Sequence, residues 1–194
     1  IPRDQYEIIV VDDGSTDGNL DSIRNFMAPE KGHVNFKYLY FPRAKKRRQG
    51  DGNFRAGIAR NQGVKFARGE ILSFVDADII VPENFLSDLI LKHHDWDVVQ
   101  CVRLHLKDKR DNHLVEYNKV DVKKQTYVLE NKYWASFFAV KDWSSLPFFW
   151  KYTCTYGLSV KTRDFKEAGW FRKTFVYYGF EDTDLGYRLA KRGK

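Results

Sequence analysis

The sequence has few cysteines and no long apolar run. Its 194 residues contain only Cys101 and Cys154, and neither lies in a CxxC or Cys/His spacing, which argues against a zinc site or a disulfide framework. We therefore expect two buried free thiols and a reducing, cytoplasmic environment. No stretch approaches the roughly 18 to 20 uncharged apolar residues of a membrane-spanning helix, and no basic-then-apolar leader opens the sequence. These absences predict a soluble protein.

Acidic residues are fewer than basic residues in this chain. The chain has 26 Asp and Glu against 33 Lys and Arg, a formal net charge of +7, and much of the excess lies in the run Arg43–Arg48. Such a run must stay hydrated, and four interpretations stay open: a solvated loop, peripheral contact with an anionic membrane, a site for a diphosphate or acidic glycan, and nucleic-acid binding. The basic balance alone selects no partner.

The chain does contain alternating strand and helix patterns. With 43% hydrophobic and 16% aromatic residues, 1–194 suffices for one compact domain with a core and a ligand cleft. Apolar runs predict strands, and apolar residues at helical spacing predict helices between them. The expected strands are 7–11, 36–41, 70–75 and 98–102; the expected helices lie around 20–27, 59–67 and 85–90 and from about 182 onward. This alternation predicts a Rossmann-like α/β fold with a mixed, mostly parallel sheet flanked by helices.

Carboxylates follow two of the predicted strands. Asp12 and Asp13 come directly after the first, and Asp76 and Asp78 after the strand at 70–75. Ligands collect at the carboxyl ends of strands in open α/β sheets, where two such carboxylates can share Mg²⁺ or Mn²⁺ with phosphate oxygens. A lone Asp-x-Asp is more often a turn or a helix cap, but its position after an apolar strand favours the metal interpretation.

A third acidic cluster, Glu181-Asp182, opens the last predicted helix. Carboxylates in a first helical turn can simply complement the helix dipole. Alternatively, one of them is a general base: a hydroxyl is a poor nucleophile at neutral pH, and a carboxylate that accepts its proton contributes about 10²- to 10⁴-fold.

Taken together, these motifs resemble family 2 glycosyltransferases of the GT-A fold. The segments that carry the resemblance, in matching order and spacing, are Tyr6–Asp17, Gly57–Gly63, Ala67–Glu70, Phe74–Asp78 and Gly179–Asp182. They cover the chain from about residue 6 to its end, with a loosely matching middle. The resemblance implies transfer of a sugar from a nucleotide-sugar, with inversion at the anomeric carbon.

On the donor side, the resemblance assigns roles to five residues. Asp12 and Asp13 would contact the nucleotide, Asp13 through a base that is usually uracil, and Arg60 would lie near it. Asp76 would lie near the ribose or the metal, and Asp78 would be the principal ligand of Mn²⁺ or Mg²⁺.

On the acceptor side, Asp182 would be the general base and Glu181 would orient the acceptor or the base. The resemblance divides the domain into a nucleotide-sugar-binding half, 1–100, and an acceptor-binding half, 101–194, whose acceptor would be a glycan or a lipid-linked molecule. Residues 159–188 also resemble the acceptor side of galactosyl- and N-acetylgalactosaminyl-transferases. The aromatic stretch 134–156 is core, acceptor pocket, or both.

One departure and three rivals accompany this interpretation. Family members begin with a further strand and a Pro-Thr-Tyr-Asn-like turn that have no counterpart here, so we expect the fold to lack its first strand.

A nucleic-acid-binding module would leave the acidic clusters unexplained, since they repel a phosphate backbone. A nucleotidyltransferase would show a Gly-rich, Lys-bearing loop. A non-catalytic nucleotide-sugar binder would not need Asp76, Asp78 and Asp182 together. We therefore expect no nucleic-acid partner.

Overall fold

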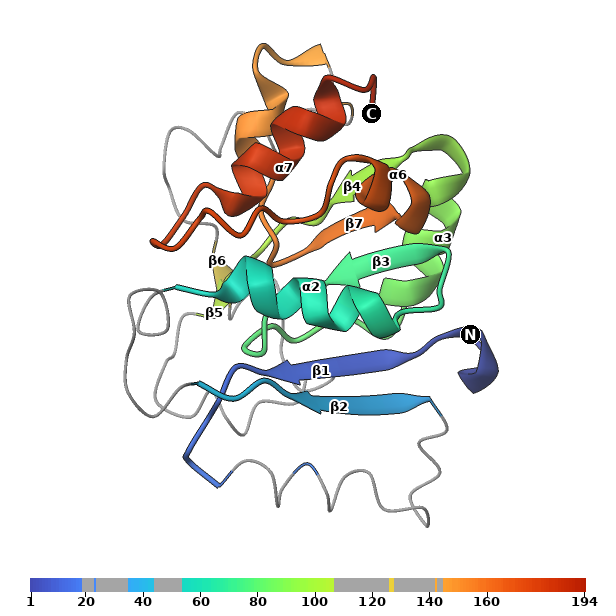
Figure 1. The fold of residues 1–194 in the computed structure, drawn as a ribbon. Helices are drawn as coiled ribbons and strands as arrows, with labels where there is room; N and C mark the ends of the chain where they lie inside the picture. The colour runs from blue at the N-terminus through green and yellow to red at the C-terminus, as the bar shows by residue number, and fades with distance from the viewer. Residues whose placement is uncertain (19–22, 24–34, 44–53, 107–125, 128–141, 143–144) are drawn as a thin grey trace.

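The computed structural model describes residues 1–18, 23, 35–43, 54–106, 126–127, 142 and 145–194. The strands are β1 (Ile8–Asp12), β2 (Phe36–Tyr40), β3 (Ile71–Phe74), β4 (Val98–Gln100), β5 (His105–Leu106), β6 (Thr126–Tyr127) and β7 (Leu158–Lys161) (Figure 1). The helices are the short η1 (Arg3–Gln5) and η6 (Phe149–Tyr152), and α2 (Ala56–Phe66), α3 (Phe85–Asp95), α6 (Thr162–Glu167) and α7 (Glu181–Ala190).

The four strands expected from the sequence are confirmed, as are the helices near 59–67 and 85–90 and the one that begins near 182. Most of the expected helix around 20–27 and of the loosely patterned segment 103–133 lies outside the described residues. Within the described part of the chain, no helix has both the length and the apolar content needed to cross a membrane.

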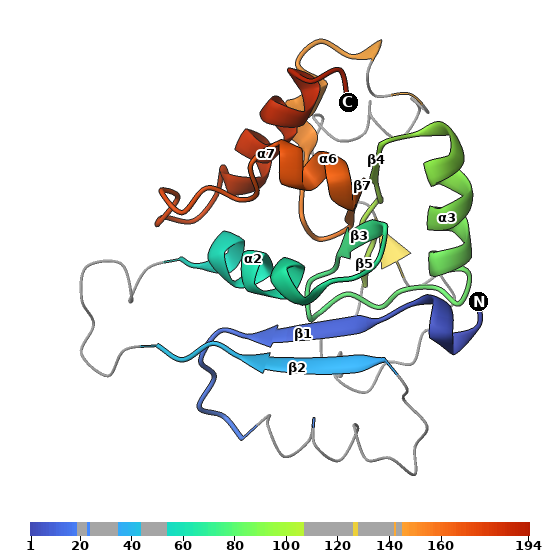
Figure 2. The same cartoon turned by 45° about the vertical axis from the view of Figure 1, so that its right-hand side comes forward.

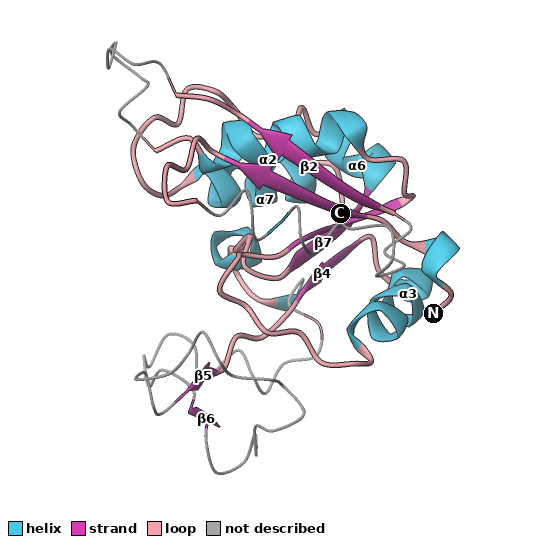
Figure 3. Cartoon of the chain, turned by 90° about the horizontal axis from the view of Figure 1, so that it is seen from below, coloured by secondary structure: helices cyan, strands magenta, loops and turns pink. Residues whose placement is uncertain are grey.

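The strand pairing is mixed. β1 and β2 are parallel, in register from Ile8 opposite Phe36 to Asp12 opposite Tyr40. β7 lies between β3 and β4 and is antiparallel to both. β5 and β6 form a short antiparallel pair set apart from the other sheets (Figure 3).

The expected α/β fold with flanking helices is therefore confirmed, but the expectation of largely parallel pairing needs correction. β3 and β4 run in the same direction, yet they do not pair with each other, because β7 separates them. The reason is the apolar content of β7: Leu158 and Val160 are fully buried, so the strand belongs in the interior between its neighbours.

The core lies around β7 and the helices that follow it. Phe165 is fully buried, and its ring centroid lies 5.5 Å from that of Phe74, 5.8 Å from Trp170 and 5.4 Å from Phe171. Burying one such phenylalanine stabilises a fold by about 1.5 to 3 kcal/mol. The buried cluster is Val64, Leu72, Leu158, Val160, Phe165, Ala168, Phe171, Leu185 and Leu189.

Helix α2 lies between the β1–β2 pair and this core (Figures 1 and 2). On one side it approaches β1 closely: a Cβ added at Gly63 would stand 3.1 Å from Cγ2 of Val11. On the other side, the buried Asn61 amide donates to the Phe171 carbonyl at 2.7 Å and accepts from the Phe171 amide at 3.1 Å. α2 thus joins the two parts of the molecule.

Candidate active site

Four elements end or begin on the same side of the molecule. The carboxyl ends of β1 and β3 lie there together with the starts of α2 and α7 (Figure 1). A helix start offers unpaired backbone N–H groups and a positive dipole end, and a parallel strand end delivers the loops that hold polar side chains. All seven site residues predicted from the sequence come from these four places or from the turn after β3.

Arg60 of α2 connects two of the predicted acidic motifs. Its Nη2 donates to Oδ1 of Asp76 at 3.1 Å, and its Nη1 donates to Oε1 of Glu181 at 3.2 Å. The arginine side chain is only 20% exposed, so both contacts are partly shielded from water. The structure therefore brings the Asp-x-Asp turn and the Glu-Asp motif together through one guanidinium group.

Glu181 is the most buried carboxylate of the site. Its side chain is 5% exposed, and its Oε2 atom has no hydrogen-bond partner among the described residues. Burial raises the pKa of Glu181 and the charge of Asp182 adds to this, while Arg60 opposes it. Gly57 permits the close packing, because a Cβ there would stand 3.5 Å from Cγ of Glu181 and 3.0 Å from Cβ of Phe171.

Asp182 is half-buried at the start of α7 and is held by backbone amides. The Thr183 amide donates to its Oδ1 at 2.9 Å, and the Thr155 amide donates to its Oδ2 over a longer 3.4 Å. Burial, and then the charge of Asp182, raise the pKa of the nearby Cys154 thiol to about 12. Cys154 and Cys101 are both half-buried free thiols, and a thiol that stays protonated is a poor nucleophile.

Asp12 closes the turn that follows β1. Its Oδ1 accepts the Ser15 amide at 2.7 Å and its Oδ2 accepts the hydroxyl of Tyr38 on β2. Burial alone would raise the pKa of Asp12, but these two hydrogen bonds outweigh it and the net shift is downward. The same bond to Asp12 is the main reason that the pKa of Tyr38 rises to about 12.

Asp13 lies between two arginines that the sequence analysis did not assign to the site. Oδ1 accepts from Nε of Arg55 at 2.9 Å, and Oδ2 accepts from Arg43, whose Nε also donates to the Asp13 carbonyl at 2.8 Å. Arg55 is 7% exposed and its guanidinium stacks 4.3 Å from the ring centroid of Phe41. The only sequence feature that could have indicated Arg55 as a site residue is its position directly before the helix α2. Of the basic run, only Arg43 lies within the described residues.

One carboxylate of the Asp-x-Asp turn has no partner among the described residues. Asp76 is 38% exposed and shares one oxygen with Arg60, whereas Asp78 is exposed and makes no hydrogen bond or ion pair with any described residue. The described part of the chain contains no group of three or more His, Cys, Asp or Glu close enough to hold a metal ion. Two carboxylates fit a hard cation whose other ligands are diphosphate oxygens and water.

The family model for glycosyl transferase family 2 matches residues 2–152. The chain belongs to this family. The match includes Asp12, Asp13, Arg60 and the Asp-x-Asp turn, and it ends before Glu181-Asp182.

Individual members of known function and structure align with nearly the whole of this chain. It is 24% identical over 202 residues to validoxylamine A glucosyltransferase of Streptomyces hygroscopicus subsp. jinggangensis (strain 5008), covering 98% of this chain and 45% of the relative. It resembles S. aureus TarS 1-349 in complex with UDP, with TM-score 0.63, 19% identity and 97% and 47% of the two chains covered. The mannosyltransferase PcManGT from Pyrobaculum calidifontis, in complex with GDP-Man and Mn²⁺, has TM-score 0.61, 20% identity and coverage of 99% and 45%. These structures confirm the GT-A fold, and the chain spans about half the length of the proteins it matches.

Proposed function

We propose that this chain is the catalytic region of a metal-dependent, inverting glycosyltransferase. It moves a sugar from a nucleotide-diphosphate sugar to a hydroxyl group of a glycan or lipid-linked acceptor. The observation that carries the proposal is the bridge from Asp76 through Arg60 to Glu181, because it places the carboxylates assigned to the donor beside those assigned to the acceptor. Family membership supports the same reaction class.

Asp182 is the proposed general base. It lies next to Glu181 in the first turn of α7 and accepts the proton of the acceptor hydroxyl as the new glycosidic bond forms. Glu181 positions this turn through its contact with Arg60. Burial is the main cause of the raised pKa of Glu181, so we assign it a positioning role and not that of the base. Attack from the side of α7 on a donor held at the end of β3 is a single in-line displacement, which inverts the anomeric carbon.

Asp78 and Asp76 are the proposed ligands of Mn²⁺ or Mg²⁺, with Asp78 as the principal one because it is exposed and makes no competing contact with a described residue. A divalent cation bound there would neutralise the charge that develops on the departing diphosphate, a contribution of several kcal/mol.

Asp12 and Asp13 are the proposed nucleotide contacts, with uracil as the base. Asp13 and its two arginines offer acceptors and donors to a planar base, and Asp12 would contact the nucleotide from the turn that its carboxylate closes. The solved relatives hold UDP in one case and GDP-Man in the other, so the base is a question for experiment.

Three wider expectations remain predictions: cytoplasmic location, peripheral membrane contact through Arg43–Arg48, and an acceptor-side likeness to galactosyl- and N-acetylgalactosaminyl-transferases. The absence of a nucleic-acid partner is a prediction too. The Arg43 contact to Asp13 supports a different role for at least one residue of the basic run, namely shaping the nucleotide end of the site.

The donor site is tested by thermal unfolding with UDP or GDP, with and without Mn²⁺. A ligand at about 100 times its Kd adds roughly 2.7 kcal/mol, which raises the midpoint by about 5 to 10 °C. We expect this rise with UDP and Mn²⁺ for the wild type and for Asp88→Asn, which changes an exposed carboxylate on α3, and its loss in Asp78→Asn. The same rise without metal would contradict the assignment of Asp78.

The general base is tested separately. In Asp182→Asn we expect sugar transfer to fall about 10²- to 10⁴-fold while the UDP-dependent rise in unfolding temperature is retained. Unchanged transfer would rule out Asp182 as the base.

A further inference from the structure

A shallow hollow of about 250 Å³ lies on the solvent side of α7, and neither the proposed donor site nor the proposed base uses it. A hollow of this size is smaller than the roughly 300 to 1,000 Å³ typical of drug-sized ligands, so it suits a smaller group. Its lining residues are Trp150, Phe175, Phe180, Thr183, Asp184 and Tyr187.

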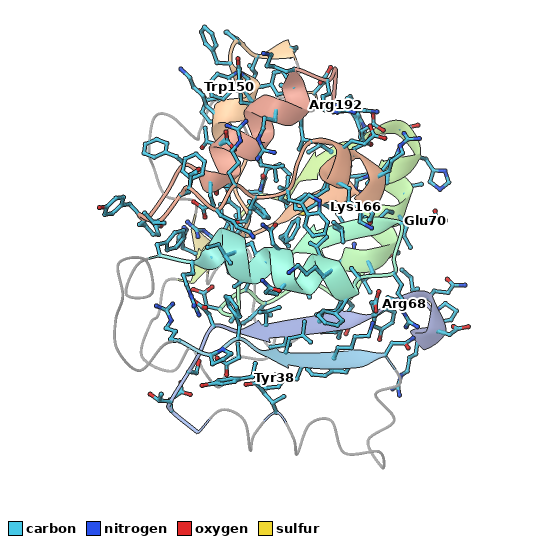
Figure 4. The ribbon with its side chains drawn as sticks, viewed as in Figure 1. Tyr38, Arg68, Glu70, Trp150, Lys166 and Arg192 are labelled. Atoms are coloured by element: carbon cyan, nitrogen blue, oxygen red, sulfur yellow. The ribbon has the colours of Figure 1, made fainter. Side chains whose placement is uncertain are left out.

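The helical register of α7 separates this hollow from the core. Phe180, Thr183 and Tyr187 follow one another at helical spacing along one face, and the opposite face carries the buried Leu185 and Leu189. From η6, Trp150 stands edge-on to Tyr187 with ring centroids 5.1 Å apart, beside α7 (Figure 4). The aromatic rings therefore line a surface that is open to ligands rather than a packed interior.

Phe180 is held in this position against its backbone preference. Its φ is 71°, in the left-handed region, and its side chain is 72% exposed. A non-glycine residue in that region costs about 1 to 3 kcal/mol, and exposure of a large apolar side chain gives no compensating burial. Core packing does not account for a phenylalanine here, whereas an aromatic ring presented to a ligand does.

Thr183 and Asp184 complete the lining of the hollow. The surface of the hollow is nevertheless almost entirely apolar, and both oxygens of Asp184 already have partners, because Oδ1 accepts from Arg172 at 3.1 Å and Oδ2 accepts from Arg188 at 2.9 Å. A sugar ring has an apolar C–H face that can stack on such an aromatic surface while the hydroxyl groups around its rim stay in water or reach the edge of the hollow.

We propose that the hollow binds one sugar ring of an acceptor glycan. This rests on the proposed function and narrows it to a saccharide acceptor. Asp182 lies in the first turn of α7 next to Phe180 and Thr183, but it contacts Thr155 rather than lining the hollow. The ring bound in the hollow is therefore a different sugar unit from the one whose hydroxyl group Asp182 would deprotonate.

The test is calorimetric binding of cello-, malto- and chito-oligosaccharides of increasing length to the full chain. We expect affinity to rise with length in at least one series, and Phe180→Gly and Tyr187→Ala to lower the affinity for the longer members about threefold to tenfold. Phe66→Ala, which removes an exposed phenylalanine from α2, serves as the matched control and should leave affinity unchanged.

Phe180→Gly also separates binding from folding. Glycine adopts positive φ without strain, so this variant should unfold at the same or a higher temperature than the wild type while its saccharide affinity falls. Equal affinity of wild type and Phe180→Gly for every oligosaccharide, or binding of none, would overturn the proposal. Aromatic-dependent binding to phosphatidylglycerol vesicles instead of saccharides would also overturn it, in favour of a membrane contact.

Nucleotide binding distinguishes this failure from failure of the proposed function. If UDP with Mn²⁺ still stabilises the chain while the hollow variants bind saccharides normally, only the subsite is wrong. If no nucleotide stabilises the chain, the donor proposal itself is wrong.

Discussion

The β1–β2 pair and the region around β7 are stabilised in different ways. No residue of β1 or β2 is fully buried, whereas three of the four residues of β7 are. Charged groups tie the first region together, including Lys37 Nζ to Glu7 Oε2 at 2.6 Å and Arg55 to Asp13. Apolar packing holds the second. Asp12 and Asp13, which are assigned to the nucleotide, therefore lie in the region that depends on ion pairs. Helix α7 packs against the apolar core.

This difference has a consequence for the reaction. Ion pairs that hold a binding site can exchange partners when a charged ligand arrives, whereas an apolar core has no such alternative. Arg60 contacts both the turn after β3 and the start of α7, so the bridge between Asp76 and Glu181 is where donor binding would affect α7.

The largest expected effect tests the core. Phe165→Ala should lower the free energy of unfolding by about 3 to 5 kcal/mol, because it removes a fully buried ring and leaves a cavity. Tyr40→Ala on β2 removes a side chain that is 51% exposed and should change it by only about 0.5 kcal/mol. Urea unfolding measures both, and similar losses would show that the two regions do not differ as described.

A smaller effect tests the ion pairs of the first region. Arg55→Met should lower the free energy of unfolding by about 1 to 3 kcal/mol, because the Phe41 carbonyl and the Asp13 carboxylate lose a buried donor. Arg172→Met is the matched control: this arginine is 56% exposed in its pair with Asp184, so we expect a loss below about 1 kcal/mol. If urea unfolding shows the same loss of free energy of unfolding for both variants, the burial of Arg55 does not strengthen its contribution to stability.

The Asp76–Arg60–Glu181 bridge makes a pH prediction. Burial raises the pKa of Glu181, so between pH 4.5 and that raised pKa the folded chain binds more protons than the unfolded chain. Stability therefore falls as pH rises through this window. Glu181→Gln cannot ionise and should show a flatter profile of unfolding temperature from pH 4.5 to neutral, whereas Glu167→Gln, an exposed site, should follow the wild type. A wild-type profile in Glu181→Gln would contradict this explanation.

The smallest effect concerns the turn after β1. The pKa of Asp12 is lowered in the fold, so its contribution is present above pH 3.8 and is lost as pH falls through the lowered value. Tyr38→Phe removes one of the hydrogen bonds responsible and should move acid unfolding to slightly higher pH. Tyr40→Phe, on the same strand, should not. Acid titration followed by circular dichroism measures the difference, and identical curves for the two variants would exclude a role for this hydrogen bond.

The local elements could be predicted because each has a local signal. The strands at 8–12 and 71–74 are apolar runs that stop at carboxylates, and the helix at 181–190 begins at Glu181-Asp182. The strand at 158–161 was missed, because four residues with a serine in the middle form neither a long apolar run nor a clear alternation. Its burial becomes visible only when β3 and β4 lie on either side of it.

The candidate site shows the same division. Asp12, Asp13, Asp76, Asp78 and the Glu-Asp motif were predicted as site residues from their positions at element ends, which the structure shows, whereas their contacts could not be predicted. Arg55 had only its place before α2 as a signal, and nothing local distinguished Arg43 from the rest of its basic run.

The sequence by itself determined the family, most of the elements and the residue types at their ends, because period, punctuation and motif spacing are local properties of the chain. Only the tertiary structure decided that β7 separates β3 from β4 and that Arg60 reaches Glu181, 121 residues away. It also decided that Phe180 faces a hollow rather than the core. These features depend on contacts between distant segments, whose free energy exists only once the backbone has brought the segments together.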